Sequence, residues 1–144
     1  MTQALAKIAS MFFVGALLAC GGSDTTSPTL TAAGNYTATF FHTTGTSGSR
    51  DELLAGSTLV LNLNSNGTTS GHLHVAAAGT TPAFDADMAG TWQQEGMTVE
   101  ISQAADTFVR DMDFILTPAA ADGWELVGDQ VFQGTRVQVT LSPS

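Results

Sequence analysis

The sequence predicts an all-β domain, and we expect an eight-stranded antiparallel up-and-down barrel. Apolar residues recur at every second position over much of the chain after residue 34, which is typical of strands with one buried face. Short turn sequences such as Asn66-Gly67 separate these runs, so consecutive strands should pair as hairpins. No segment of useful length shows the period of an amphipathic helix.

Eight segments carry this alternation. They lie at residues 35–40, 58–63, 72–75, 84–93, 97–101, 108–116, 124–126 and 137–141. The long loop 44–56 contains one stretch, residues 51–55, that could form a helical turn. A meander of eight strands can hide its edges by closing into a barrel. A two-sheet β-sandwich is the alternative, because the same alternation permits it.

Four motifs support the barrel by resemblance. They are the opening Gly34-Asn35-Tyr36, the strand Ser57–Leu63 with its Asn-Gly turn, the tripeptide Gly90-Thr91-Trp92, and the closing Thr135–Leu141. With these motifs the chain resembles the small lipocalin-like lipoproteins of Gram-negative bacteria, over roughly residues 34 to 142. The resemblance implies a barrel whose interior can hold a small apolar or amphipathic molecule.

An export signal precedes this domain. Residues 1–19 begin with a polar stretch containing Lys7 and continue with an apolar run, which is shorter than the roughly 20 residues that span a bilayer and fits a signal-peptide core. The run ends in Leu17-Leu18-Ala19-Cys20, which resembles the lipobox of bacterial lipoproteins. The resemblance implies cleavage before Cys20, which then carries a diacylglycerol thioether and usually an N-acyl chain such as palmitate.

The predicted domain organisation follows from this signal. We expect a signal peptide at 1–19, a lipidated flexible tether at 20–33 and the barrel domain at 34–144. Several acyl chains anchor a protein stably, whereas a single chain binds only marginally. We therefore expect an exported protein of the bacterial cell envelope, lipid-anchored in the outer membrane on its periplasmic or surface side. The alternative is an ordinary secretory signal that leaves Cys20, the only cysteine, as a free thiol.

The charge of the chain excludes nucleic-acid partners. After Cys20 there are three arginines, no lysine and 13 acidic residues, a net charge of −10. Such a chain is repelled by phosphate backbones and by anionic lipid surfaces. The expected partners are the membrane, through the lipid on Cys20, and a small apolar ligand, while the sequence does not identify a protein partner.

The sequence indicates no catalytic site, metal site or cofactor. There is no Gly-x-Ser-x-Gly elbow and no cysteine nucleophile within the domain, so we expect no enzyme. His72 and His74 share one strand face about 6.6 Å apart, a spacing that can hold a metal. They lie opposite Leu73 and Val75, however, so we expect them on the solvent face. The Asp-x-Asp pairs at 85/87 and 111/113 likewise have outward parity, which predicts an acidic outer surface.

Arg110 breaks the apolar pattern of its segment. It shares parity with Phe108, Met112, Phe114 and Leu116, which predicts that its guanidinium points into the barrel. If Glu95-Gly96 and residues 103–106 are turns, Arg110 lies in one row with Trp92, within reach of a cation–π contact. An arginine packed over a tryptophan resembles the closing arrangement of lipocalins. Arg110 is then either a plug at the closed end or an anchor for a ligand.

Two functions are consistent with these features. The leading hypothesis is a membrane-tethered binding protein, with Arg110, Trp92, Tyr36 and Met112 as the candidate ligand-binding residues. The alternative is a non-enzymatic surface or assembly protein with a solid core that acts through its acidic exterior. An eight-stranded barrel can be filled by side chains or can hold one ligand, so the space inside the barrel distinguishes the two.

Overall fold

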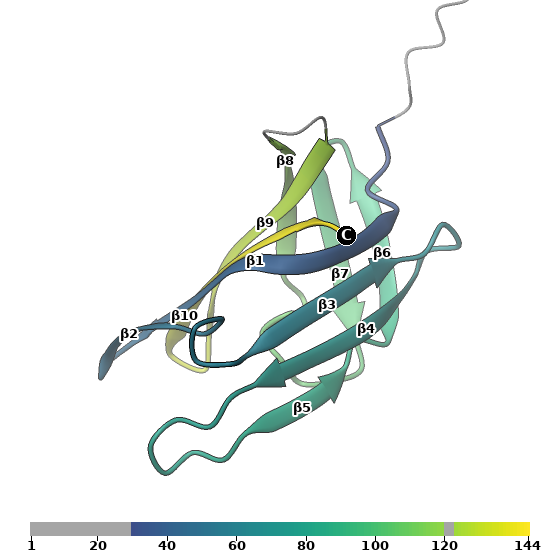
Figure 1. Cartoon of the computed structure of the whole chain (residues 1–144). Coiled ribbons are helices and arrows are strands. Elements are labelled where there is room, and N and C mark those ends of the chain that lie inside the picture. The colour runs from purple at the N-terminus through teal and green to yellow at the C-terminus, as the bar shows by residue number, and fades with distance from the viewer. Residues whose placement is uncertain (1–29, 120–122) are drawn as a thin grey trace, which may run out of the picture.

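Eight antiparallel strands pair in a closed ring, because the last strand, β10, returns to the first, β1. The structure, a computed structural model, describes residues 30–119 and 123–144. Two additional short strands, β2 and β5, attach to the ring at β1 and β4 (Figure 1). The predicted barrel is therefore confirmed, in preference to the sandwich. Cys20, the predicted signal peptide and most of the predicted tether lie outside the described residues.

The strands of the ring follow one another as a meander. In spatial order they are β1 (Gly34–Gly45), β3 (Thr58–Leu63), β4 (Thr68–Val75), β6 (Gly90–Glu95), β7 (Thr98–Gln103), β8 (Asp113–Ala119), β9 (Gly123–Phe132) and β10 (Thr135–Pro143). The additional strands are β2 (Gly48–Asp51) and β5 (Phe84–Asp87). Strand β2 lies inside the segment that the sequence predicted as a loop, and the predicted helical turn follows it, with the Ala55 amide donating to the Asp51 carbonyl at 3.2 Å.

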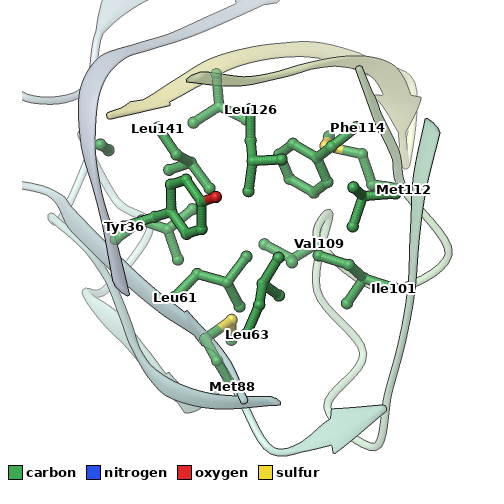
Figure 2. Packing of buried hydrophobic residues seen from close by; sticks show 14 of the residues in the cluster. Tyr36, Leu61, Leu63, Met88, Ile101, Val109, Met112, Phe114, Leu126 and Leu141 are labelled. Carbon is green, nitrogen blue, oxygen red and sulfur yellow. The ribbon is translucent and has the colours of Figure 1, made fainter. Parts of the chain in front are cut away.

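The core occupies the barrel interior, where inward side chains from opposite walls meet (Figure 2). The inner face of β3 consists of the three leucines predicted from the alternation, and β10 contributes an equally apolar inner face. These buried residues are Leu59, Leu61, Leu63, Val137, Val139 and Leu141. The period-two alternation of these strands thus corresponds directly to their buried faces.

One end of the barrel is closed by the chain that leads into β1. Ala32 is completely buried, its amide donates to Gln94 Oε1 at 2.8 Å, and its carbonyl accepts from the Tyr36 hydroxyl at 2.9 Å. Residues 30–33 therefore pack as part of the barrel, four residues before the predicted start of the domain. We call this the closed end.

The predicted single strand 84–93 is wrong. It is broken between β5 and β6, which both pair with β4: β5 along residues 72–75 and β6 at residues 68–69. Between them Met88 turns inward, is fully buried and donates its amide to the Gly71 carbonyl at 3.1 Å. The segment predicted as one strand thus forms two strands that pair with different parts of β4, and only the second of them, β6, belongs to the closed ring.

The predicted strand 108–116 is also wrong over its first half. Strand β8 begins at Asp113, and residues 107–112 form turns, with the Arg110 amide donating to the Thr107 carbonyl at 3.1 Å. The reason is visible in the burial of three successive residues, Thr107, Phe108 and Val109. A strand sends neighbouring side chains to opposite faces and cannot bury all three in one core, whereas a turn can.

Candidate functional site

A pocket of about 470 Å³ opens at the end of the barrel opposite the closed end, and we call this end the open end. Its wall comes from the far end of β1, the end of β4, the start of β5, the end of β9 and the start of β10. The apolar lining residues are Phe41, Leu73, Val75, Ala76, Ala78, Pro82, Phe84, Phe108, Phe132 and Val137. Four of the eight phenylalanines of the chain thus lie on this one wall.

The pocket exists because two strands do not reach the open end. Strand β7 ends at Gln103 and β8 begins only at Asp113, so the segment between them crosses this end as turns. Phe108 of this segment packs on Phe41, with ring centroids 5.1 Å apart and the rings tilted by 43°. The Gln130 side-chain amide donates to the Phe108 carbonyl and holds the segment against β9. Both phenylalanines line the pocket and also belong to the buried core, so they lie where the pocket meets the core.

A buried polar cluster forms one side of the pocket. Glu52 is only 3% exposed, and its carboxylate accepts from the Thr43 hydroxyl at 2.7 Å and from the Ser57 hydroxyl at 2.9 Å. Arg50 Nη1 lies 3.5 Å from the same carboxylate. Thr43 and Arg50 also line the pocket, so this cluster supplies its polar corner.

Arg50 also links two segments at the open end by hydrogen bonds. Arg50 donates to the carbonyls of Ala76 and Ala77, at 3.3 and 3.0 Å, and the Ala76 amide donates to Ser57 Oγ at 2.9 Å. These bonds connect β2 and the turn after it to the loop between β4 and β5. Arg50 is therefore fixed in the wall of the pocket.

The predicted inward orientation of Arg110 is wrong. Its side chain is 45% exposed and pairs with Asp106 at 3.6 Å and Asp111 at 3.4 Å. Arg110 lies on the turn segment rather than on a strand, so the parity argument does not apply to it. The predicted row with Trp92 is not formed either, because the β6–β7 hairpin turns at Gly96-Met97 and pairs Trp92 with Ile101.

The other three predicted ligand-binding residues lie away from the apolar pocket. Tyr36 is at the closed end, where burial raises the pKa of its phenol. Met112 is buried in the core, with its sulfur close over Gly128. Trp92 is half-buried, donates its indole N–H to the Asn64 carbonyl at 2.8 Å, and borders a polar groove of about 450 Å³ on the outside of β6 and β7.

Sequence reasoning missed the residues that do line the pocket. Arg50 and Glu52 belong to segment 44–56, which has no alternation and therefore predicts no face. The alternation correctly predicts a buried Phe108, but it also predicts a strand over residues 108–112, where the structure has turns. The unusual concentration of aromatic rings could have been noticed only with the strand ends in the right places.

The chain matches no protein-family model, no curated protein and no solved structure. The geometry of its own residues is therefore the basis for any function. No helix in the described part of the chain is long and apolar enough to cross a membrane.

The two predicted outward histidines form a polar cluster on the outer face of β4 and β5. His72 Nε2 and His74 Nδ1 lie 3.0 and 2.8 Å from the same oxygen of Asp85, and His72 Nδ1 lies 3.4 Å from Asp87. The pairing of β4 with β5 brings these residues opposite one another. Within residues 30–119 and 123–144, no group of three or more histidine, cysteine, aspartate or glutamate side chains is arranged to hold a metal ion.

These contacts shift the pKa values of His72 and Asp85. Hydrogen bonds that the carboxylates of Asp85 and then Asp87 accept raise the pKa of His72 above its ordinary value of 6.5, and His74 and His72 together lower the pKa of Asp85. A raised histidine pKa adds stability that is fully present at low pH and is lost as the pH rises through the folded-state pKa.

We expect proton NMR titration to find His72 titrating above 6.5, and Asp85→Asn to move its pKa down toward that value. Asp85 is still ionised where His72 becomes charged, because its own pKa is lowered. The stability difference between the two forms should therefore be larger below the pKa of His72 than above it. Asp113→Asn, on the outer face of β8, is the control and should leave the His72 titration unchanged. Identical His72 titrations in the Asp85→Asn form and the unaltered chain would contradict the pairing.

Proposed function

We propose that this protein is a lipid-anchored lipoprotein whose lipocalin-like barrel binds a small apolar or amphipathic molecule in the pocket at the open end. The observation that carries the binding role is the apolar, phenylalanine-rich wall of that pocket. Its volume falls within the range of roughly 300 to 1,000 Å³ that is common for small-molecule sites. Burial of apolar ligand surface supplies about 25 cal/mol per Å² removed from water.

The residues around the pocket favour binding over chemistry. Its lining includes no histidine, serine or cysteine among the described residues, so the usual nucleophiles and imidazole bases are missing from this part of the wall. Its two charged residues, Arg50 and Asp106, each have a partner of opposite charge. We accordingly propose a carrier or a sensor of its ligand rather than an enzyme.

The proposed anchor and the pocket would lie at opposite ends of the barrel. The chain enters the barrel through residues 30–33 at the closed end, on the side from which Cys20 would connect it to the membrane. A tether at this end would leave the open end facing away from the lipid surface. Ligand exchange would then take place in the aqueous compartment.

Replacing Cys20 with serine should release the protein from membranes, because a serine cannot form the thioether that attaches the diacylglycerol. The measurement is membrane fractionation followed by a salt wash, with Ser57→Ala, a change in the polar cluster beside the pocket, as the control that should stay attached. A Cys20→Ser protein that remains as firmly bound as the control would refute lipid attachment.

The assembly hypothesis has one observation in its favour. Three apolar side chains of the outer face, Phe40, Val127 and Ile115, are more than a third exposed and follow one another across β1, β9 and β8, with Thr140 of β10 between the first two. Such a row can contact a protein partner. It does not involve the pocket, so a variant that fills the pocket separates the two functions.

Filling the pocket with Val75→Trp should weaken binding of the uncharged dye phenylnaphthylamine by at least about 10-fold, or 1.4 kcal/mol. Val75 lines the pocket, whereas Val60 lies on the outer face of β3, so Val60→Trp is a matched control. Residues 21–144 are suitable for this fluorescence titration, because they include every described strand and contact. Equal dye affinity in the two variants would refute the pocket as the binding site and favour the assembly function.

A further inference from the structure

We infer that the pocket selects uncharged ligands over anionic ones, although an arginine lies in its wall. This inference rests on the proposed binding function and names the class of ligand. It follows from the partners of each charged residue near the pocket, beginning with Arg50.

Arg50 is the only cationic residue among those that line the pocket. Its guanidinium is 3.5 Å from the Glu52 carboxylate and donates to the carbonyls of Ala76 and Ala77. The charge of this group is therefore already paired, and two of its five N–H groups already donate to backbone carbonyls. A ligand carboxylate or sulfonate at the remaining N–H groups would share this guanidinium with the Glu52 carboxylate, a group of the same charge.

Separating the Glu52 carboxylate from the Arg50 guanidinium is energetically unfavourable. Its side chain is buried, and the hydroxyls of Thr43 and Ser57 hold both of its oxygens in place. If a ligand anion took Arg50, the Glu52 charge would remain buried without its counter-ion. Leaving a buried carboxylate without its counter-ion is unfavourable.

The remaining charges at the open end do not attract anions either. Asp106 lines the pocket and pairs with Arg110, which also contacts Asp111, so carboxylates outnumber guanidinium groups at this rim. The third arginine, Arg136, is paired with Asp129. Every arginine of the described residues is thus bound to a carboxylate, and the chain after Cys20 carries a net charge of −10.

An anionic head group would therefore lose its hydration at this pocket without gaining a counter-ion. An uncharged molecule avoids that loss and still contacts the phenylalanine rings. The chemical class expected in the pocket is an uncharged apolar or weakly polar compound, with aromatic rings well suited to the wall.

The test compares two dyes with the same aromatic skeleton, phenylnaphthylamine and anilinonaphthalenesulfonate, which differ by one sulfonate. Fluorescence titration of residues 21–144 at about 0.5 M sodium chloride removes most of the long-range repulsion and leaves the local chemistry. We expect the uncharged dye to bind at least about 10-fold tighter. Equal affinities, or tighter binding of the sulfonate, would overturn the inference alone, whereas no binding of either dye would remove the proposed function as well.

Glu52→Gln tests the mechanism directly. The amide oxygen can still accept one hydroxyl, but Arg50 loses its counter-charge, so sulfonate binding should tighten by at least about 3-fold while binding of the uncharged dye changes little. An unchanged ratio of the two affinities would contradict the role of Glu52.

Arg110→Gln is a second variant at an exposed position, and it should weaken sulfonate binding because Asp106 loses its partner. Stronger sulfonate binding in that variant would also contradict the inference.

Discussion

Replacing Gly71 with alanine should destabilise the barrel by at least about 3 kcal/mol. Gly71 lies in the middle of β4, opposite Leu61 of β3, with a φ of 129° that side-chain-bearing residues rarely adopt. A Cβ at this position would lie 2.1 Å from the Val60 carbonyl oxygen and 2.9 Å from its carbonyl carbon. Both are backbone atoms of a neighbouring strand, so no side-chain rotation can relieve the clash.

We expect the urea concentration at the midpoint of unfolding to fall strongly in this variant. The measurement is urea unfolding monitored by far-ultraviolet circular dichroism. Gly96→Ala is the matched control, because Gly96 also has a positive φ, 61°, but has no atom within 4 Å of an added Cβ. It should lose only about 1–2 kcal/mol from backbone strain. Similar losses in both variants would show that β3 and β4 are not as close at Gly71 as the structure has them.

Gly71 matters beyond its own strand. Its carbonyl accepts from the Met88 amide, at the point where β5 ends and the chain moves over to β6. A shift of the backbone at Gly71 would therefore disturb both the closure of the ring and the position of β5, which lines the pocket through Phe84. We expect ligand binding to be lost together with stability in the alanine variant.

The barrel was predictable from the sequence because its regular strands each bury one face. The alternation of leucines in β3 and of aliphatic residues in β10 indicated the correct inner faces, and Asn66-Gly67 indicated the correct hairpin. The errors came where the chain departs from this regularity. Residues 84–93 have apolar residues or glycine at every second position, so the periodicity predicts one strand, yet the chain leaves the sheet at Met88 between two strands.

The candidate site was not predictable by the same reasoning. Parity predicts an inward Arg110 only if residues 108–116 form one strand, while the burial of both Phe108 and Val109 requires a turn. The arginine of the pocket wall is Arg50, which lies on β2 in a polar segment without any apolar pattern. Its position depends on an ion pair with Glu52, two residues along the chain, and on hydrogen bonds to the distant residues 76 and 77, and alternation encodes neither.

Replacing Phe41 with alanine should lower the free energy of unfolding by about 3–5 kcal/mol. Phe41 is fully buried and packs on Phe108 where the pocket meets the core. Its neighbour Phe40 is 41% exposed on the outer face, where it stacks on His42 at 4.4 Å. Phe40→Ala should therefore cost less than about 1 kcal/mol, and the two variants compare the same deletion on opposite faces of one strand. Comparable losses would contradict the assigned orientation of β1 at this end.

The pair Phe41 and Phe108 also tests what holds the turn segment 104–112 in place. The segment is not part of a strand, so we expect the Phe41–Phe108 packing to fix its position over the core, with help from Gln130. A double-mutant cycle with alanine at both positions should then give a coupling of about 0.5–1.5 kcal/mol, beyond the two separate losses of area. Strictly additive losses would mean that the segment is held elsewhere. If the two rings are coupled, loss of either ring should also deepen the pocket toward the core. The affinity of the double variant for phenylnaphthylamine should then differ from that of the unaltered chain. The affinity of the Phe40→Ala variant should stay unchanged.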